Sequence, residues 1–290
     1  MNVSEEKLVL SEVKSECPVC LFDEPHESIS KCFGHIRSTW LKCGECGTFF
    51  IWPLPTAEQL SEYYRSGYAD CQSPGAVSHS YRFSEANKET IFREYQLSLS
   101  DVHIPTAMLL GKKVLDYGCA NGFFLDFCAG QGCLKENLFG FDIAEDLLAS
   151  VGKKGYRMLD AKQKHFDFLF LWDVLEHISE PAKLLRELRS YLKPGGTVVL
   201  QTPRIGLLTE SLREAWEHFL PFEHVVLYTR QSLIRLFEEA GFRLVAVSSF
   251  GANAPVGAVP EPYKTAVDRL AKVTDNGSTQ VARFMLKKIF

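Results

Sequence analysis

Four cysteines near the start of the chain form two CxxC pairs with the spacing of a metal site. Cys17 and Cys20 make the first pair, Cys43 and Cys46 make the second, and 22 residues separate the pairs. Two such pairs favour a zinc ribbon, because each tight turn aims two sulfurs at one tetrahedral ion. Four thiolates leave no open position, so we expect a structural Zn2+, about one per chain. The alternatives are unrelated free thiols and a redox dithiol, and no thioredoxin-like context supports the latter.

A glycine turn between an apolar run and a helix start is the second place for chemistry. Residues 114–125 read VLDYGCANGFFL, and Gly118 and Gly122 let the backbone turn sharply and approach a ligand. The helix start presents N–H groups to an anion. Asp142 closes the next predicted strand, 20 residues after Gly122, where an acid accepts the hydroxyls of a ribose. The turn indicates a nucleoside-type ligand, unless it serves only strand–helix packing.

The spacing of the turn argues against a dinucleotide. The dinucleotide fingerprint G-x-G-x-x-G requires a third glycine, and Phe123 stands in its place. A pyrophosphate would have poor access there, whereas a methionine carboxylate needs less room.

Two Glu-His pairs follow predicted strands and are candidates for proton transfer. Glu176 and His177 follow the fourth strand, and Glu223 and His224 follow the fifth. Histidine is the usual general base near neutral pH. A residue that only hydrogen-bonds the backbone at a helix start is the alternative for His177. Nearby aromatic residues either wall an acceptor pocket or, as we slightly favour, form core beneath a lid: Trp216, Phe219 and Phe222.

From residue 112 onward, apolar runs alternate with amphipathic stretches. The predicted strands are 113–117, 138–142, 156–159, 166–172, 197–201 and 243–248, and the predicted helices are 123–130, 144–153, 180–191 and 229–240. Such alternation implies βαβ units, and hence a doubly wound, Rossmann-like, mostly parallel α/β sheet. Near the end, 262–272 is predicted helical, and 280–288 is either a strand or a short amphipathic helix.

Three segments follow from these patterns. Residues 1–55 form the small N-terminal zinc ribbon, 56–105 a helical linker or cap, and 106–290 the ligand-binding α/β domain. Within the linker, helical stretches at 56–68 and 81–104 flank a loop at 66–80 that is rich in Ser, Gly and Pro.

Composition narrows the possible partners. The chain has 290 residues and a net charge of −4, and residues 1–55 hold five Lys and Arg against eight Asp and Glu. Nucleic acid is therefore an improbable partner, since phosphate binding needs clustered basic residues. No apolar run reaches the ~18 residues of a membrane span. Nine cysteines without a visible secretory signal favour reduced thiols and a cytoplasmic location.

Four segments resemble one family in their order and spacing. They read LDYGCANGFFL, GFDIAEDLL, FDFLFLWDVLEHISEP and LLRELRSYLKPGGTVVLQTP, and they resemble the class I S-adenosylmethionine-dependent methyltransferases. The later FLPFEHVVLYTRQSLIRLFEEAGF is similar to a branch that carries a four-cysteine ribbon and includes sugar and small-molecule methyltransferases. The resemblance covers residues 15–70 and 112–250. One departure is Ala120, where the family often has glycine.

The resemblance implies that nine residues contact S-adenosylmethionine, each at a particular part of the molecule. Asp116, Gly118, Cys119 and Gly122 shape the methionine site, Asp142 holds the ribose, Ile143 contacts the adenine, Asp160 meets the adenine amino group, and Trp172 and Asp173 line the sulfonium side.

The resemblance also implies a function. Sugar C-methyltransferases use a Glu-His pair at the position of Glu223 and His224, although Pro221 and Phe222 replace the Tyr and His of those enzymes. We expect methyl transfer to O or C of a small-molecule acceptor, a sugar nucleotide, glycan or secondary metabolite, with a histidine general base. An RNA methyltransferase that clamps RNA with the ribbon, and a non-catalytic interaction module, are the alternatives. The sequence leaves the oligomeric state open.

Overall fold

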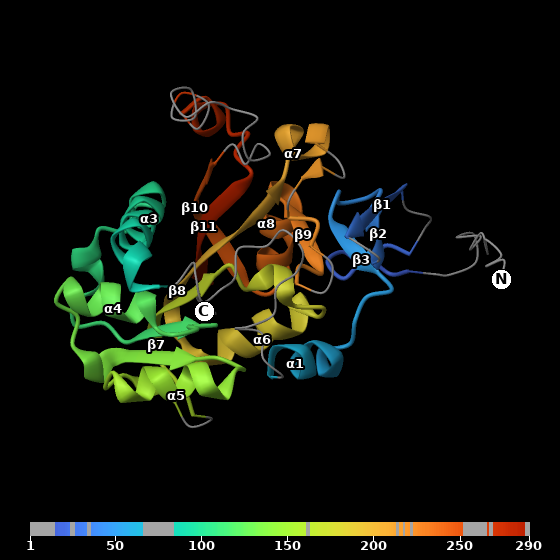
Figure 1. The fold of residues 1–290 in the computed structure, drawn as a ribbon. Helices are drawn as coiled ribbons and strands as arrows, with labels where there is room; N and C mark the ends of the chain where they lie inside the picture. Colours follow the sequence, from blue (N-terminus) through green and yellow to red (C-terminus); the bar gives the residue numbers. More distant parts are fainter. Residues whose placement is uncertain are drawn as a thin grey trace.

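Five neighbouring parallel strands form the centre of the computed structural model, which describes residues 15–23, 27–33, 36–65, 84–160, 163–212, 215–216, 218–220, 223–251, 266 and 269–287 (Figure 1). The strands are β4 (Val114–Tyr117), β5 (Leu138–Phe141), β6 (Arg157–Met158), β7 (Phe166–Trp172) and β8 (Leu192–Ile205). Their order is β6-β5-β4-β7-β8, so the direction of winding reverses at β4. Ligands of open parallel sheets bind beyond the carboxyl ends of the strands at such a reversal.

Helices connect these strands and cover both faces of the sheet, which confirms the predicted α/β fold class. They are α4 (Phe123–Gly130), α5 (Glu145–Lys153), α6 (Pro181–Tyr191) and α8 (Arg230–Glu239). β7 shows how the sheet is buried: Leu169 and Leu171 pack in one apolar cluster with α6, and Phe170 packs in a second cluster with α4. Alternate residues of a strand point to opposite faces, so a strand with apolar residues at both alternate sets of positions requires cover on both faces.

The carboxyl-terminal end of the described chain completes this sheet. β11 (Thr279–Leu286) lies between β8 and β10 (Phe242–Phe250), antiparallel to both. The segment predicted as strand or helix is therefore a strand. The strand predicted at 197–201 is longer than expected, because Leu192 already pairs with β7 ahead of a register shift, and Thr202 and Pro203 pair with β11.

The ribbon strands belong to the same sheet. β1 (Glu27–Phe33), β2 (Ile36–Lys42) and β3 (Phe49–Trp52) are antiparallel, and β3 pairs with β9 (Val226–Thr229), which itself runs parallel to β8. Figure 1 shows β1–β3 at one side of the molecule, next to β9. The predicted domain boundaries stay a prediction, but the described part of the ribbon is built onto the larger sheet.

The predicted linker contributes α1 (Ala57–Arg65) and α3 (Lys88–Asp101). Its predicted loop at 66–80 lies outside the described residues, as does most of the helix predicted at 262–272, of which residues 266 and 269–272 are described and helical. The short helix α7 (Leu207–Leu212) has no counterpart among the predicted elements. Among the helices described, none combines the length and the apolar character needed to cross a membrane.

Candidate functional site

The turn between β4 and α4 has the backbone geometry that its glycines predict. Gly118 and Gly122 have φ of +80° and +81°, and Gly122 is the N-cap of α4. The N–H groups of Gly118 and Cys119 both donate to the carbonyl oxygen of Phe141 at the end of β5, at 2.7 and 2.9 Å. Ala120 also has a positive φ, +47°. This explains why a glycine is common there in the family, since only glycine adopts that conformation without cost.

Asp142 ties this turn to the end of β5. Its two carboxylate oxygens accept hydrogen bonds from the backbone N–H groups of Ala120 and Ala144, at 2.8 and 2.9 Å. Burial raises the pKa of the Asp142 carboxyl, and the hydrogen bonds from Ala144 and Ala120 oppose that rise. Each oxygen keeps a second lone pair for a ligand. The carboxylate lines a cavity of about 1200 Å3, as a ribose-binding acid must.

Asp116 indicates what the cavity holds beside the glycine turn. Its side chain is 2% exposed, lines the cavity, and its Oδ1 atom has no hydrogen-bond partner in the structure. Burial, with a contribution from Asp142, raises the pKa of Asp116 well above its usual range. Buried polar atoms are nearly always paired, so a ligand donor is expected here. The ammonium group of S-adenosylmethionine supplies such a donor, and in this respect the residues fit the implied cofactor.

Replacement of Gly118 by alanine tests how closely the glycine turn packs against Val174. A Cβ atom at residue 118 would lie 2.5 Å from Cγ2 of Val174. Gly111→Ala is the matched control, since Gly111 has φ +68° and no atom within 4 Å of a Cβ. A left-handed conformation costs a non-glycine residue about 1–2 kcal/mol. We expect Gly118→Ala to lose more unfolding free energy in urea than the control, and to weaken S-adenosylhomocysteine binding. Equal losses in the two variants would contradict the close approach.

The remaining predicted cofactor residues divide into two groups. Ile143, Trp172 and Asp173 line the cavity together with Cys119. Asp173 has φ +51°, and its carboxylate accepts from the side-chain amide of Gln201 at 3.2 Å. Asp160 is not among the lining residues; its side chain accepts from the backbone N–H of Gln163. The structure therefore gives no support for a contact between Asp160 and adenine, and that role stays a prediction.

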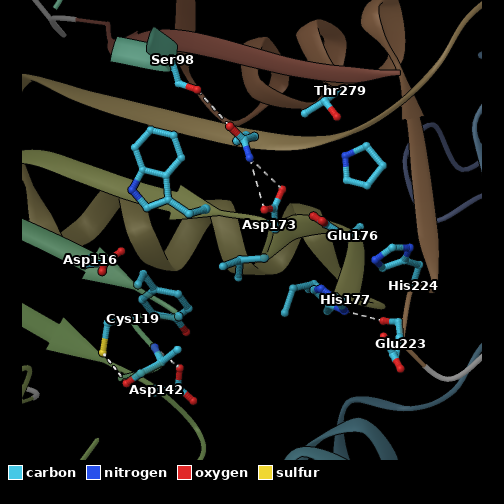
Figure 2. A pocket seen from close by; sticks show the side chains of 18 of the residues that line it. Ser98, Asp116, Cys119, Asp142, Asp173, Glu176, His177, Glu223, His224 and Thr279 are labelled. Carbon is cyan, nitrogen blue, oxygen red and sulfur yellow. Dashed lines mark hydrogen bonds between the residues drawn. The ribbon is translucent and has the colours of Figure 1, made fainter. Parts of the chain in front are cut away.

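The first Glu-His pair lies on the opposite side of the same cavity, after β7 (Figure 2). Glu176 is fully buried, and its Oε2 accepts from the hydroxyl of Thr202 at 2.9 Å. Nδ1 of His177 is hydrogen-bonded to the backbone carbonyl oxygen of Glu223. Because a carbonyl only accepts, Nδ1 carries a proton in this contact. Burial lowers the pKa of His177 and so favours the neutral form.

The second pair meets the first. His224 is 7% exposed, and its ring lies 5.0 Å from that of His177, measured between centroids. Nδ1 of His224 donates to the carbonyl oxygen of His218 at 2.7 Å, so Nε2 is the basic nitrogen. The N–H of Val225 donates to the carbonyl oxygen of Glu176 at 2.7 Å, which fixes the two loops together. Glu223 lines the cavity, and its backbone oxygen is the atom that contacts His177.

Tyr64 and Gln201 belong to this site although sequence reasoning assigned neither of them to it. Tyr64 comes from α1, and its hydroxyl lies 2.7 Å from Nδ1 of His177. The paired tyrosines that follow the ribbon are the sequence feature from which this contact could have been suspected. For Gln201, within β8, the only pointer is its place near the carboxyl end of a parallel strand.

The aromatic residues near His224 are core. Trp216 is fully buried and Phe219 is 2% exposed, and neither lines the cavity. Both belong to the apolar cluster that includes Trp40 of the ribbon. Phe222 lies outside the described residues.

The four ribbon cysteines form a compact cluster. Their sulfur atoms lie within 4.8 Å of one another, with 3.7 Å between Cys17 and Cys46 and 3.5 Å between Cys20 and Cys43. Four sulfurs at 2.3 Å from a tetrahedral ion lie about 3.8 Å apart. The hydrogen bond between Cys17 and Cys46 lowers the pKa of Cys46 to about 5 and raises the pKa of Cys17, so Cys46 is the thiolate of this pair. The donor set and the spacing fit zinc.

The ribbon also contacts the segment 216–229, which carries His218 and His224. Lys31 donates to the carbonyl oxygen of Trp216 at 2.7 Å, and Thr229 donates to the carbonyl oxygen of Cys46 at 3.1 Å. The N–H of Ile51 donates to the carbonyl oxygen of Val225 at 3.0 Å. The ring of Phe219 packs against those of Trp40 and Phe49, at 5.1 and 5.5 Å between centroids.

A family model described as a methyltransferase domain matches residues 85–247. Two curated proteins are similar to the chain. A ubiquinone biosynthesis O-methyltransferase of Pseudomonas aeruginosa is 36% identical over 110 residues, which are 33% of this chain and 46% of that protein. A tRNA U34 carboxymethyltransferase of Hydrogenovibrio crunogenus is 26% identical over 234 residues, 66% of this chain and 70% of that protein. The chain thus spans about half the length of the first of these relatives.

The fold has solved counterparts. A 1,6-didemethyltoxoflavin-N1-methyltransferase of Burkholderia thailandensis, solved with its substrate and S-adenosylhomocysteine, superposes with a TM-score of 0.53. It is 14% identical in sequence, and the match covers 89% of this chain and 99% of that one. At this identity the likeness concerns the fold alone.

Proposed function

The chain belongs to the class I S-adenosylmethionine-dependent methyltransferases, and on that premise we propose that it methylates an oxygen or carbon atom of a small-molecule acceptor. One observation carries the proposal: the residues predicted to hold the cofactor, such as Asp116 and Asp142, line the same cavity as the two histidines, His177 and His224. Figure 2 places Asp116, Cys119 and Asp142 on one side of this cavity and His177 and His224 on the other. A donor and an acceptor bound to the two halves would meet between them.

On the donor side, the chain's own residues hold the cofactor. When bound, S-adenosylmethionine supplies a methyl group on a positively charged sulfur, so the donor needs no further activation. Asp116 and the turn at Gly118 would bind the methionine part, and Asp142 the ribose. Trp172, the last residue of β7, and Asp173 would line the sulfonium side, and Ile143 would contact the adenine. Methyl transfer then requires in-line alignment of the acceptor atom at about 3–3.5 Å.

On the acceptor side, the histidine pair promotes loss of the acceptor's proton. His224 is the general base in this proposal. Its Nδ1–H donates to the carbonyl oxygen of His218, so Nε2 is the nitrogen that accepts the acceptor's proton. His177 and Glu223 support this arrangement, since the carbonyl oxygen of Glu223 fixes the ring of His177. The loops that carry Glu176 and Val225, which are joined by a hydrogen bond, would together with α1 exclude water from the reacting atoms.

The four ribbon cysteines complete the proposal. We propose that Cys17, Cys20, Cys43 and Cys46 hold a structural Zn2+, because their sulfur atoms have the mutual distances of a tetrahedral thiolate site. The ribbon would then stabilise the loops of the acceptor side and take no part in the chemistry.

Transfer of a labelled methyl group tests the function. The purified chain is incubated with S-[methyl-14C]adenosylmethionine and, in parallel, with a panel of sugar nucleotides, phenols and polyols and with total RNA. Label in a small molecule supports the proposal. Label in RNA alone would replace it with the RNA alternative. Cofactor binding without transfer to any acceptor would favour a non-catalytic module.

RNA is the second candidate acceptor because tRNA U34 carboxymethyltransferases are among the relatives. One of them, from Hydrogenovibrio crunogenus, matches two thirds of this chain. Against it stands the local charge: residues 1–55 hold three more acidic than basic residues, so the ribbon is a poor surface for phosphates. The RNA arm of the assay decides between the two.

Asp142→Asn tests the donor half. An amide cannot accept with both of its atoms, so it loses one link to the glycine turn and one acceptor for the ribose. A hydrogen bond to a charged group contributes about 1.5–3 kcal/mol, so we expect the dissociation constant of S-adenosylhomocysteine to rise roughly 10- to 100-fold by calorimetry. Glu136→Gln, at an exposed residue outside the cavity, is the control. Unchanged affinity in Asp142→Asn would remove this residue from the cofactor site.

A further inference from the structure

The glycine turn between β4 and α4 is strained at Ala120. Its φ of +47° lies in the left-handed region, which only glycine adopts without cost. A strained backbone conformation persists where the surrounding contacts fix it. The cavity supplies one such contact, because the carboxylate of Asp142 accepts from the N–H of Ala120 at 2.8 Å. Asp142 therefore holds the turn from the side on which the cofactor would bind.

Lys154 holds the same turn from outside the cavity. It is the C-cap residue of α5, and it is not among the residues that line the cavity. Its ammonium nitrogen donates to the backbone carbonyl oxygen of Asn121 at 2.8 Å. Asn121 follows Ala120 directly and precedes Gly122, the N-cap of α4. Two successive residues of the turn are thus fixed by side chains from the two ends of α5, since Asp142 precedes that helix and Lys154 follows it.

A second partner keeps the Lys154 ammonium in place. It also donates to Oδ2 of Asp126 at 2.7 Å, and the hydroxyl of Tyr156 donates to Oδ1 of the same carboxylate at 2.8 Å. The side chains of Lys154 and Asp126 are 31% and 17% exposed, so water competes only in part for this pair. A cation near the start of a helix is unfavourable, because the N–H groups there carry partial positive charge. Asp126, in the first turn of α4, compensates that cost.

We infer that Lys154 is a positioning residue of the cofactor site, which keeps the turn at residues 118–122 in the conformation that binds S-adenosylmethionine. The inference rests on the proposed function through the cofactor alone, and it holds for any acceptor. Without the bond to Asn121, Ala120 can relax toward a negative φ, and the turn leaves the shape that the methionine part of the cofactor requires. The apparent dissociation constant then rises by the inverse of the fraction of molecules whose turn remains competent.

The strain at Ala120 makes this role distinguishable from simple stabilisation of the fold. A glycine at residue 120 would adopt the positive φ about as readily as a negative one, so the turn would need less support from its neighbours. The effect of removing the Lys154 ammonium should therefore depend on the residue at position 120. An ion pair that only stabilises the fold would contribute equally with either residue, because independent effects add.

Calorimetric titration of the full chain with S-adenosylhomocysteine tests the inference. Lys154→Met removes the ammonium and keeps an unbranched side chain. We expect the dissociation constant to rise roughly tenfold, the bias that one left-handed residue produces. Lys153→Met is the matched control, because Lys153 is the exposed last residue of α5. In the Ala120→Gly background, the same change at Lys154 should raise the dissociation constant by roughly threefold at most.

Folding and activity separate the possible outcomes. Urea unfolding shows whether each variant is folded, and Lys154→Gln repeats the test if Lys154→Met is not. Equal affinities of Lys154→Met and Lys153→Met would overturn the inference, as would an equal loss with and without Ala120→Gly.

The methyl-transfer assay adds an independent readout. Lys154→Met should raise KM for S-adenosylmethionine more than it lowers kcat, because the lost contact supports binding of the cofactor. Coupling between Lys154 and Ala120 in a chain that binds S-adenosylhomocysteine and methylates no small molecule would support the inference and refute the proposed function. A wild-type chain that does not bind S-adenosylhomocysteine would overturn both.

Discussion

Replacement of His224 by alanine is expected to lower methyl transfer roughly 10²- to 10⁴-fold, the range that a positioned acid–base group contributes. The affinity for S-adenosylhomocysteine should remain close to that of the wild-type chain. His224 lies in the segment before β9, whereas the donor half is built from the turns after β4 and β5. The two halves line the same cavity, but the carboxylate of Asp142 hydrogen-bonds Ala120 and Ala144 and no described residue of the segment that carries His224. The variant should therefore lose methyl transfer to the acceptor and keep its affinity for the cofactor.

The measurement combines two assays on one preparation. Calorimetric titration with S-adenosylhomocysteine gives cofactor affinity, and transfer of labelled methyl to the acceptor found in the panel gives turnover. His103→Asn is the matched control, because His103 is exposed, lies outside the cavity, and has a positive φ that asparagine tolerates. Turnover equal to that of the control would exclude His224 from the reaction.

The strands and helices around the donor half were predictable from local pattern. The helix 123–130 and the strand 166–172 have the predicted bounds, because a glycine with positive φ starts the former and a nearly continuous apolar run, interrupted by Asp167, defines the latter. The glycine turn was predictable in the same way, because Gly118 and Gly122 are the residue type that adopts a positive φ most readily. Local geometry of this kind depends on neighbouring residues, and a single chain reveals it.

The acceptor half depends on contacts between distant segments, which spacing does not reveal. Tyr64 reaches His177 across 113 residues, and Val225 binds the carbonyl oxygen of Glu176. The sequence drew attention to His177 and His224 as separate pairs, but their meeting at 5.0 Å is a property of the fold. The pairing of β3 with β9 was missed for the same reason, since both strands are four residues long and lie far apart in sequence.

Replacement of Cys43 by serine is the second large change, and we expect it to abolish zinc binding by the ribbon and to unfold it. The apparent free energy of binding a structural zinc is about 10–16 kcal/mol, and in small ribbons it is largely the free energy of folding. Cys43 is 1% exposed and its sulfur lies in the four-cysteine cluster. Cys32→Ser is the control, because Cys32 is an exposed cysteine of β1 outside that cluster. Elemental analysis should find the ribbon zinc in the control and lose it in Cys43→Ser.

The effect of Cys43→Ser should extend to turnover, although none of the ribbon residues that the structure describes lines the cavity. β3 is the sheet partner of β9, Lys31 binds the carbonyl oxygen of Trp216, and Thr229 binds that of Cys46. An unfolded ribbon removes all three, so the segment 216–229 loses support on the side away from the cavity and His224 loses its fixed position. We expect strongly reduced methyl transfer, faster hydrogen exchange in residues 216–229, and nearly normal S-adenosylhomocysteine binding, since Asp142 and the glycine turn lie at the other end of the cavity. A zinc-free chain that still methylates its acceptor at the rate of Cys32→Ser would show that the catalytic loop holds its own shape, and that the ribbon serves another purpose.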